Sequence, residues 1–154
     1  LTRAAGGAFA VTLSDSFCID RHRGAFIDLV EHHTDILFSN EQEIISLYQA
    51  DDCEAALRRA EGKCRIICVT RGEKGAVILG RGERVEVAAE PVEKLVDTTG
   101  AGDQFAAGFL FGLSRSMDLA DCGKIGAIAA AEVISHYGAR PEQNLAALIA
   151  AKIG

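Results

Sequence analysis

The chain has 154 residues, of which 49% are hydrophobic, and its formal net charge is −6. This length and apolar content are enough for one domain with a buried core. The negative charge argues against nucleic acid or an anionic membrane surface as the main partner. No signal peptide is indicated, and five cysteines without a CxxC pair favour reduced thiols, so we expect a cytoplasmic protein. The sequence lacks an initial Met and soon becomes apolar, as expected for a piece of a longer polypeptide.

Short apolar runs alternate with amphipathic segments along the chain. In chain order the patterns predict a strand at 8–14, a helix at 20–33, a strand at 35–39, helices at 41–49 and 52–62, a strand at 65–70, a hairpin of 75–80 with 83–89, and helices at about 103–115, 118–137 and 141–152. Apolar strands that alternate with helices indicate a mostly parallel sheet covered on both faces. Ligands bind such sheets beyond the carboxyl ends of the strands, where several polar clusters of this sequence fall.

A glycine-rich loop, DTTGAGD, leads into an apolar helix pattern. Gly100 and Gly102 allow backbone N–H groups to approach a bound anion, Ala101 leaves room for it, and the helix start adds a positive dipole end. Asp103 is placed to accept a proton from an attacking hydroxyl group, as phosphoryl transfer requires. The alternative is an aspartate that merely caps the helix after a tight turn. The spacing alone leaves both interpretations open.

The longer run VDTTGAGDQFAAGF closely resembles the signature of PfkB-type kinases, the family of ribokinase and adenosine kinase. The resemblance implies that Asp103 is the general base and that Gly100, Ala101 and Gly102 form the anion hole for the transferring phosphoryl group. It also implies a ribokinase-like, three-layer α/β/α fold with a mostly parallel sheet. Residues 1–154 would then be the C-terminal, ATP-binding part of a single kinase domain, with the lid and the N-terminal part absent.

Two further segments match the family. In SNEQE, Asn40 and Glu43 have the spacing of a capping box. The family has an Asn-x-x-Glu motif here, which implies that Asn40 helps to organise the nucleotide phosphates and that Glu43 helps to hold Mg²⁺. In VTRGEKGAV, the resemblance implies that Thr70 and Gly72 line the ATP and that Gly75 permits the turn into the hairpin. A strand, a turn and a hairpin without any ligand are the alternative.

The segments around TLSDSF and ISHYGAR carry less specific matches. The first resembles the adenosine kinase branch, which implies that Phe17 packs on a nucleobase, whereas the alternative is an ordinary core Phe. The second lies where the family's chain passes the adenine of ATP, so His136 is expected to be a wall residue. Many members bind a monovalent cation nearby, which makes Asp97 and Thr99 the candidates for K⁺. A helix C-cap with Gly138 in the left-handed conformation needs no ligand.

The resemblance implies ATP- and Mg²⁺-dependent phosphoryl transfer to a hydroxymethyl group of a nucleoside or sugar, as in adenosine kinase. The alternatives are a sugar kinase of the ribokinase or fructokinase type and a non-catalytic nucleotide-binding fragment. A dinucleotide-binding Rossmann domain is disfavoured, because the first predicted strand ends in TLSDSF rather than G-x-G-x-x-G. We expect the partners to be small molecules, and neither nucleic acid nor a membrane. The resemblance is compatible with a homodimer. We expect no turnover by this chain alone.

Overall fold

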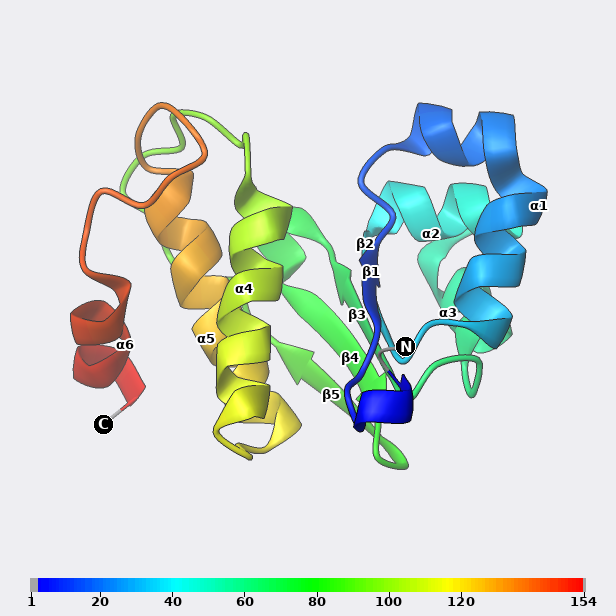
Figure 1. Cartoon of the computed structure of the whole chain (residues 1–154). Coiled ribbons are helices and arrows are strands. Elements are labelled where there is room, and N and C mark those ends of the chain that lie inside the picture. The colour runs from blue at the N-terminus through cyan, green and yellow to red at the C-terminus, as the bar shows by residue number, and fades with distance from the viewer. Residues whose placement is uncertain (1–2, 154) are drawn as a thin grey trace. The chain divides into compact units, whose positions relative to one another are not determined.

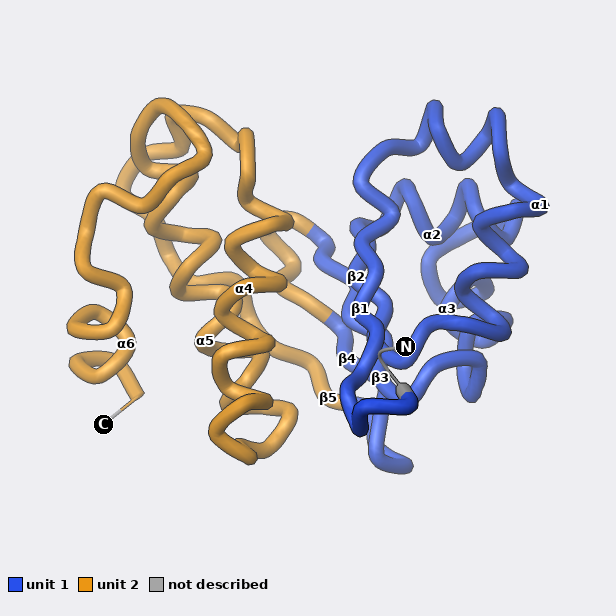
Figure 2. Tube along the Cα trace, viewed as in Figure 1, with its two compact units in different colours: residues 1–71, 77–84 blue, residues 72–76, 85–154 orange. Residues whose placement is uncertain are grey.

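The structure is a computed structural model of the chain, and it describes residues 3–153. The chain divides into two compact units, which Figure 2 shows in different colours. Unit 1 comprises residues 1–71 and 77–84, and unit 2 comprises residues 72–76 and 85–154.

The strands and helices follow one another along the chain as labelled in Figure 1. The strands are β1 (Ala10–Thr12), β2 (Ile36–Asn40), β3 (Ile66–Thr70), β4 (Ala76–Gly80) and β5 (Glu83–Val87). The α-helices are α1 (Ser16–His32), α2 (Glu41–Tyr48), α3 (Cys53–Ala60), α4 (Ala101–Ser114), α5 (Leu119–Val133) and α6 (Leu145–Ile153). Single 3₁₀ turns lie at Arg3–Ala5 and Gly72–Lys74. Within residues 3–153, no helix is long and apolar enough to cross a membrane.

The five strands form one sheet in the order β1-β2-β3-β4-β5. The pairs β1–β2 and β2–β3 are parallel, with Phe38 between Thr12 and Cys68 in the register. The connections 71–75 and 81–82 are too short for the crossover that parallel neighbours need, so β4 and β5 run antiparallel to the strands before them. The sheet is therefore mixed, and the prediction of a mostly parallel sheet is wrong, whereas the α/β class is confirmed.

The core of unit 1 lies between the sheet and helices α1, α2 and α3. Apolar side chains of β2 and β3, such as Leu37 and Ile67, pack there with helix residues such as Ile44 and Leu57, and all four are at most 1% exposed. The run 8–14 was expected to be a buried strand, but most side chains of β1 are exposed. In the strand order of the sheet, β1 is an edge strand and pairs with β2 alone.

Helix boundaries depart from the sequence pattern where side chains cap the backbone. Helix α1 begins earlier than expected because Asp15 accepts a hydrogen bond from the Phe17 N–H at its N-terminus. Helix α5 ends before position 137 because the carbonyl of Ile134 accepts a hydrogen bond from the Val96 N–H, at 2.8 Å, instead of continuing the helix. Helix α6 starts at Leu145, so Pro141 does not occupy its first turn.

Helices α4 and α5 of unit 2 pack closely through glycines. A Cβ atom on Gly108 would lie 2.8 Å from the carbonyl oxygen of Ile125, and one on Gly126 would lie 2.8 Å from that of Phe105. Such distances leave no room for a side chain, so both positions require glycine. This contact fixes the start of α4, where the glycine-rich loop ends, against a well-packed partner helix.

Candidate active site

Polar residues of unit 1 gather at the carboxyl ends of neighbouring strands. Asn40 ends β2 and Thr70 ends β3, and the two are register partners in the parallel pair. The Thr70 hydroxyl donates a hydrogen bond to the carbonyl of Ser39, at 3.4 Å. The sheet thus brings together two residues that lie far apart in the sequence, as the strand pattern predicted.

Asn40 and Glu43 form a complete capping box at the start of α2. The Glu43 N–H donates to Asn40 Oδ1 at 2.9 Å, and the Asn40 N–H donates to Glu43 Oε2 at 2.9 Å. The Asn40 side-chain amide also donates to Glu43 Oε1, at 2.8 Å. Burial raises the pKa of the Glu43 carboxyl group, the Asn40 hydrogen bond partly opposes this, and the charge of Asp15 adds to it. A cation close to Glu43 would stabilise the charged form of this buried carboxylate.

Phe17 lies in the first turn of α1 and its side chain is 81% exposed. The alternative of an ordinary core Phe is therefore wrong. Its backbone N–H donates to Asp15 Oδ1 at 2.9 Å, so the helix cap fixes this residue at the surface. A large exposed aromatic ring is available for stacking on a planar ligand, and the contact with a nucleobase stays a prediction.

The segment after β3 contains two glycines with different constraints. Gly75 has φ +79°, and a Cβ atom there would lie 1.9 Å from the carbonyl oxygen of Val87. Its N–H donates to the carbonyl of Gly72 at 3.0 Å, which closes the 3₁₀ turn. Gly75 is thus required by the turn into the hairpin, whereas a Cβ on Gly72 would meet nothing within 4 Å. The role of Gly72 beside ATP stays a prediction.

In unit 2, Asp97 organises the start of the glycine-rich loop. Its Oδ1 accepts the Thr99 N–H at 2.9 Å, and its Oδ2 accepts the Gly138 N–H at 3.1 Å. Hydrogen bonds from the Thr99 side chain and from these two N–H groups lower the pKa of the Asp97 carboxyl group. Within residues 3–153, the structure contains no cluster of three or more His, Cys, Asp or Glu side chains that could hold a metal ion. The cation assignments therefore stay predictions.

Gly100 is the N-cap of α4, with φ +81° and no side-chain cap. A Cβ atom there would lie 2.6 Å from the Cβ of Ala139, so both the backbone angle and the space require glycine. The Ala101 N–H donates to the carbonyl of Thr98 at 3.2 Å. In the part of the chain that the structure describes, the next two N–H groups, of Gly102 and Asp103, have no acceptor. They are free to bind an anion at the positive end of the helix.

Asp103 is the third residue of α4 and is exposed. Because the N-cap is Gly100, the alternative that Asp103 caps the helix is wrong. Its carboxylate makes no hydrogen bond or ion pair within residues 3–153. An unpaired carboxylate beside two free N–H groups has the arrangement that a general base needs next to an anion hole.

Gly102 has no packing reason to be glycine. It lies inside α4, it is exposed, and a Cβ atom there would meet nothing within 4 Å. Glycine inside a helix is less favourable than alanine by roughly 0.5–1 kcal/mol. Open space beside a free N–H group suits a ligand that comes close to the backbone.

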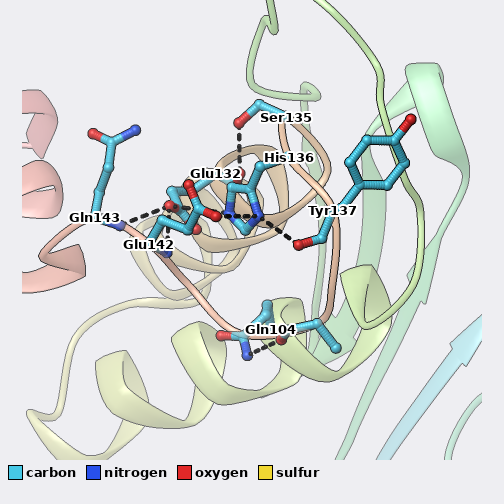
Figure 3. Close-up of polar contacts among 8 residues, drawn as sticks. Gln104, Glu132, Ser135, His136, Tyr137, Glu142 and Gln143 are labelled. Atoms are coloured by element: carbon cyan, nitrogen blue, oxygen red, sulfur yellow. Dashed lines mark hydrogen bonds and ion pairs between the residues drawn. The ribbon is translucent and has the colours of Figure 1, made fainter.

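Glu132 and the cavity beside it are functional candidates that the sequence pattern does not indicate. The cavity has a volume of about 330 Å³ and lies in unit 2. It is lined by residues 90–94 together with Ile128, Ala131, Glu132, Ser135, Gln143, Leu148 and Lys152. His136 turns toward Glu132 (Figure 3), and its Nε2 lies 3.3 Å from Glu132 Oε1. A single acidic residue inside an Ala-rich helix pattern was the available signal.

The loop and helix start of unit 2 combine two N–H groups that have no acceptor among the described residues with an unpaired carboxylate. The family model described as "pfkB family carbohydrate kinase" matches residues 2–145. The chain therefore belongs to the PfkB family of kinases.

Solved structures agree with this assignment. A probable sugar kinase from Rhizobium etli CFN 42 is 50% identical with a TM-score of 0.92, over 98% of this chain and 46% of that one. An adenosine kinase from Sinorhizobium meliloti is 44% identical with a TM-score of 0.92, and the match also covers 98% of this chain and 46% of that one. A candidate ribokinase II from Escherichia coli, solved with ATP and Mg²⁺, is 24% identical with a TM-score of 0.83, over 95% and 48%, which shows a shared fold alone. This chain spans less than half the length of each of these structures.

Proposed function

We propose that the complete protein transfers the γ-phosphoryl group of ATP to a hydroxymethyl group of a nucleoside, in the manner of adenosine kinase. The observation that supports this most is the unpaired Asp103 carboxylate beside the free N–H groups of α4. Asp103 takes the proton of the attacking hydroxyl group while the new O–P bond forms. The bond between the γ-phosphorus and the bridging oxygen breaks, and ADP leaves. The N–H groups stabilise the charge of the transferring group.

The remaining site residues would hold the nucleotide and its cations. Asn40 and Thr70, which the register places side by side, would bind phosphate oxygens, and Gly72 would line the ATP. Both oxygens of Glu43 already accept hydrogen bonds from Asn40, so Glu43 suits a contact through the waters of Mg²⁺. Asp97 and Thr99 would border a K⁺ site.

The cavity in unit 2 is our candidate site for the base of ATP, and His136 would support its wall through Glu132, a lining residue whose Oε1 lies 3.3 Å from His136 Nε2. Its volume of about 330 Å³ lies within the usual range for small-molecule pockets. Apolar residues such as Ile128 and Ala131 line part of it, and polar or charged residues make up the rest: Glu90, Glu93, Lys94, Glu132, Ser135, Gln143 and Lys152. This mixed lining suits a planar group that both packs on apolar side chains and forms hydrogen bonds.

A sugar kinase is the second candidate, because the chain is 50% identical to a probable sugar kinase. A screen of the complete protein with ATP and Mg²⁺ against adenosine, a pyrimidine nucleoside, ribose and fructose separates the two. We expect the highest kcat/KM with a nucleoside, because the exposed Phe17 ring offers a stacking surface. A preference for a sugar would support the second candidate. ATP binding without transfer to any acceptor would indicate a non-catalytic protein.

These 154 residues alone are proposed to lack turnover, since they span less than half of each matched structure. The substrate contacts would then lie in the remaining part of a longer chain. A cytoplasmic location and a homodimer stay predictions. The experiments below therefore use the complete protein.

We expect Glu43→Gln to raise the Mg²⁺ concentration needed for half-maximal turnover while the melting temperature stays near that of the wild type. Gln also completes a capping box, so the start of α2 is preserved. The charge that attracts the hydrated cation is lost. Steady-state rates over a Mg²⁺ titration and a melting curve measure both effects. An unchanged Mg²⁺ dependence would mean that Glu43 acts only in the capping box.

A further inference from the structure

Glu132 carries a buried carboxylate in the last turn of α5, and its side chain is fully buried. Its Oε1 accepts the backbone N–H groups of Glu142 and Gln143, at 3.0 and 2.9 Å (Figure 3). A buried carboxylate is unfavourable unless it is well hydrogen-bonded. Here its bonds attach a distant turn of the chain to the end of the helix.

The remaining polar atoms around Glu132 have incomplete hydrogen bonding. His136 Nε2 lies 3.3 Å from Glu132 Oε1, and His136 Nδ1 lies 3.8 Å from a carboxylate oxygen of Glu142. Glu132 Oε2 is buried and has no hydrogen-bond partner within residues 3–153. An apolar residue would avoid this cost at the same place, so stability alone is a weak reason for the carboxylate.

We call residues 134–141 the bracing segment, because they contact the glycine-rich loop along its length. The carbonyl of Ile134 accepts the Val96 N–H at 2.8 Å. The Gly138 N–H donates to the carboxylate of Asp97, as described above. Figure 3 shows the Gln104 side-chain amide donating to a backbone carbonyl of this segment, that of Ala139, at 3.2 Å.

The bracing segment is held at both ends. Helix α5 fixes its start, and the bonds from Glu142 and Gln143 to Glu132 fix the chain directly after it. Between these ends, Ala139 lies against the N-cap Gly100, with no room for another atom. A shift of this segment would therefore move the loop that presents the free N–H groups and Asp103.

We propose that Glu132 is a positioning residue, which holds the bracing segment against the glycine-rich loop and so sets the geometry of the anion hole. The catalytic consequence rests on the proposed kinase function, whereas the bracing itself does not. The competing explanation is that Glu132 contributes only to the stability of α5.

The test compares Glu132→Ala and Glu132→Gln with Asp118→Ala in the complete protein. Asp118 caps the other end of α5 through the Asp121 N–H, at 2.8 Å, so its loss destabilises the same helix without touching the bracing segment. Hydrogen exchange of the amides in residues 97–104 measures the bracing. Melting curves and steady-state kinetics, with kcat and KM determined separately, measure stability and catalysis.

We expect Glu132→Ala to speed exchange in residues 97–104 and to lower kcat by about 10–100-fold, because small displacements of positioned groups have effects of this size. KM for the acceptor should change much less. Glu132→Gln keeps an acceptor oxygen for the two N–H groups and should recover most of the protection and rate. Asp118→Ala should lower the melting temperature and leave exchange in the loop and kcat near wild type.

Equal exchange in the loop for Glu132→Ala and Asp118→Ala would overturn the proposal, and so would exchange in Glu132→Gln as fast as in Glu132→Ala. If Glu132→Ala does not fold, Glu132→Leu replaces it, because Leu keeps most of the volume and removes the acceptor. Loop exchange faster than in Asp118→Ala then supports the bracing, and equal exchange overturns it. A wild-type protein without kinase activity would refute the proposed function, and the exchange data would still decide the bracing.

Discussion

Asp103→Asn is expected to reduce turnover by roughly 10²–10⁴-fold, the usual contribution of a general base. The amide cannot accept the proton of the attacking hydroxyl group. Stability should change little, because the Asp103 side chain has no partner within residues 3–153 and does not cap α4. ATP affinity should hold or improve, since a negative charge next to the bound phosphates is removed.

The measurement pairs a melting curve and an ATP-binding titration with a steady-state kinase assay of the complete protein. Asp118→Asn is the matched control, because it makes the same chemical change at a true helix N-cap. Asn caps a helix about as well as Asp, so the control should alter neither stability nor rate. Turnover of Asp103→Asn near the wild-type value, at unchanged stability, would show that this carboxylate is not the base.

Gly102→Ala is expected to lower kcat by about 10²-fold, as displacement of a positioned group does. Stability should stay the same or rise by up to about 1 kcal/mol, since alanine replaces glycine in a helix. The new methyl group meets no protein atom within 4 Å. It would instead occupy the space next to the free N–H groups, where the transferring phosphoryl group is proposed to lie.

Gly24→Ala provides the control for this change. Gly24 also lies inside a helix, α1, it is exposed, and a Cβ atom there would meet nothing within 4 Å. The control should gain a similar amount of stability and keep full activity. If Gly102→Ala is as active as Gly24→Ala, no ligand group comes close to the backbone at position 102, and the anion hole must lie elsewhere.

The sequence predicts those elements whose signals are local. The apolar runs of β2 and β3 mark buried strands, and the dipeptide Arg81–Gly82 marks the hairpin turn, where both residues have positive φ. The exposure of β1 was not predictable, because an apolar run does not reveal how many neighbours a strand has. The mixed sheet is not evident from the apolar runs, because strand direction depends on the short connections around β4, which exclude a parallel crossover.

The site was predictable at the level of the motif and not at the level of its bonds. The spacing of Asn40 and Glu43 indicated a capping box, which the structure contains. Whether Asp103 caps α4 depended on a shift of a few residues in the helix start, which the sequence pattern does not resolve. The role of Glu132 depends on backbone N–H groups that only the folded chain brings to it.

The contact between Gly100 and Ala139 means that the glycine-rich loop is not a separable module. The N-cap Gly100 packs tightly against Ala139. A larger side chain at position 139 would therefore clash with the loop, as a substitution within the loop would. Anyone who transfers this loop to another scaffold has to transfer the segment 134–143 with it. For protein engineering, the smallest portable unit is therefore a pair of segments, one at the start of α4 and one after α5.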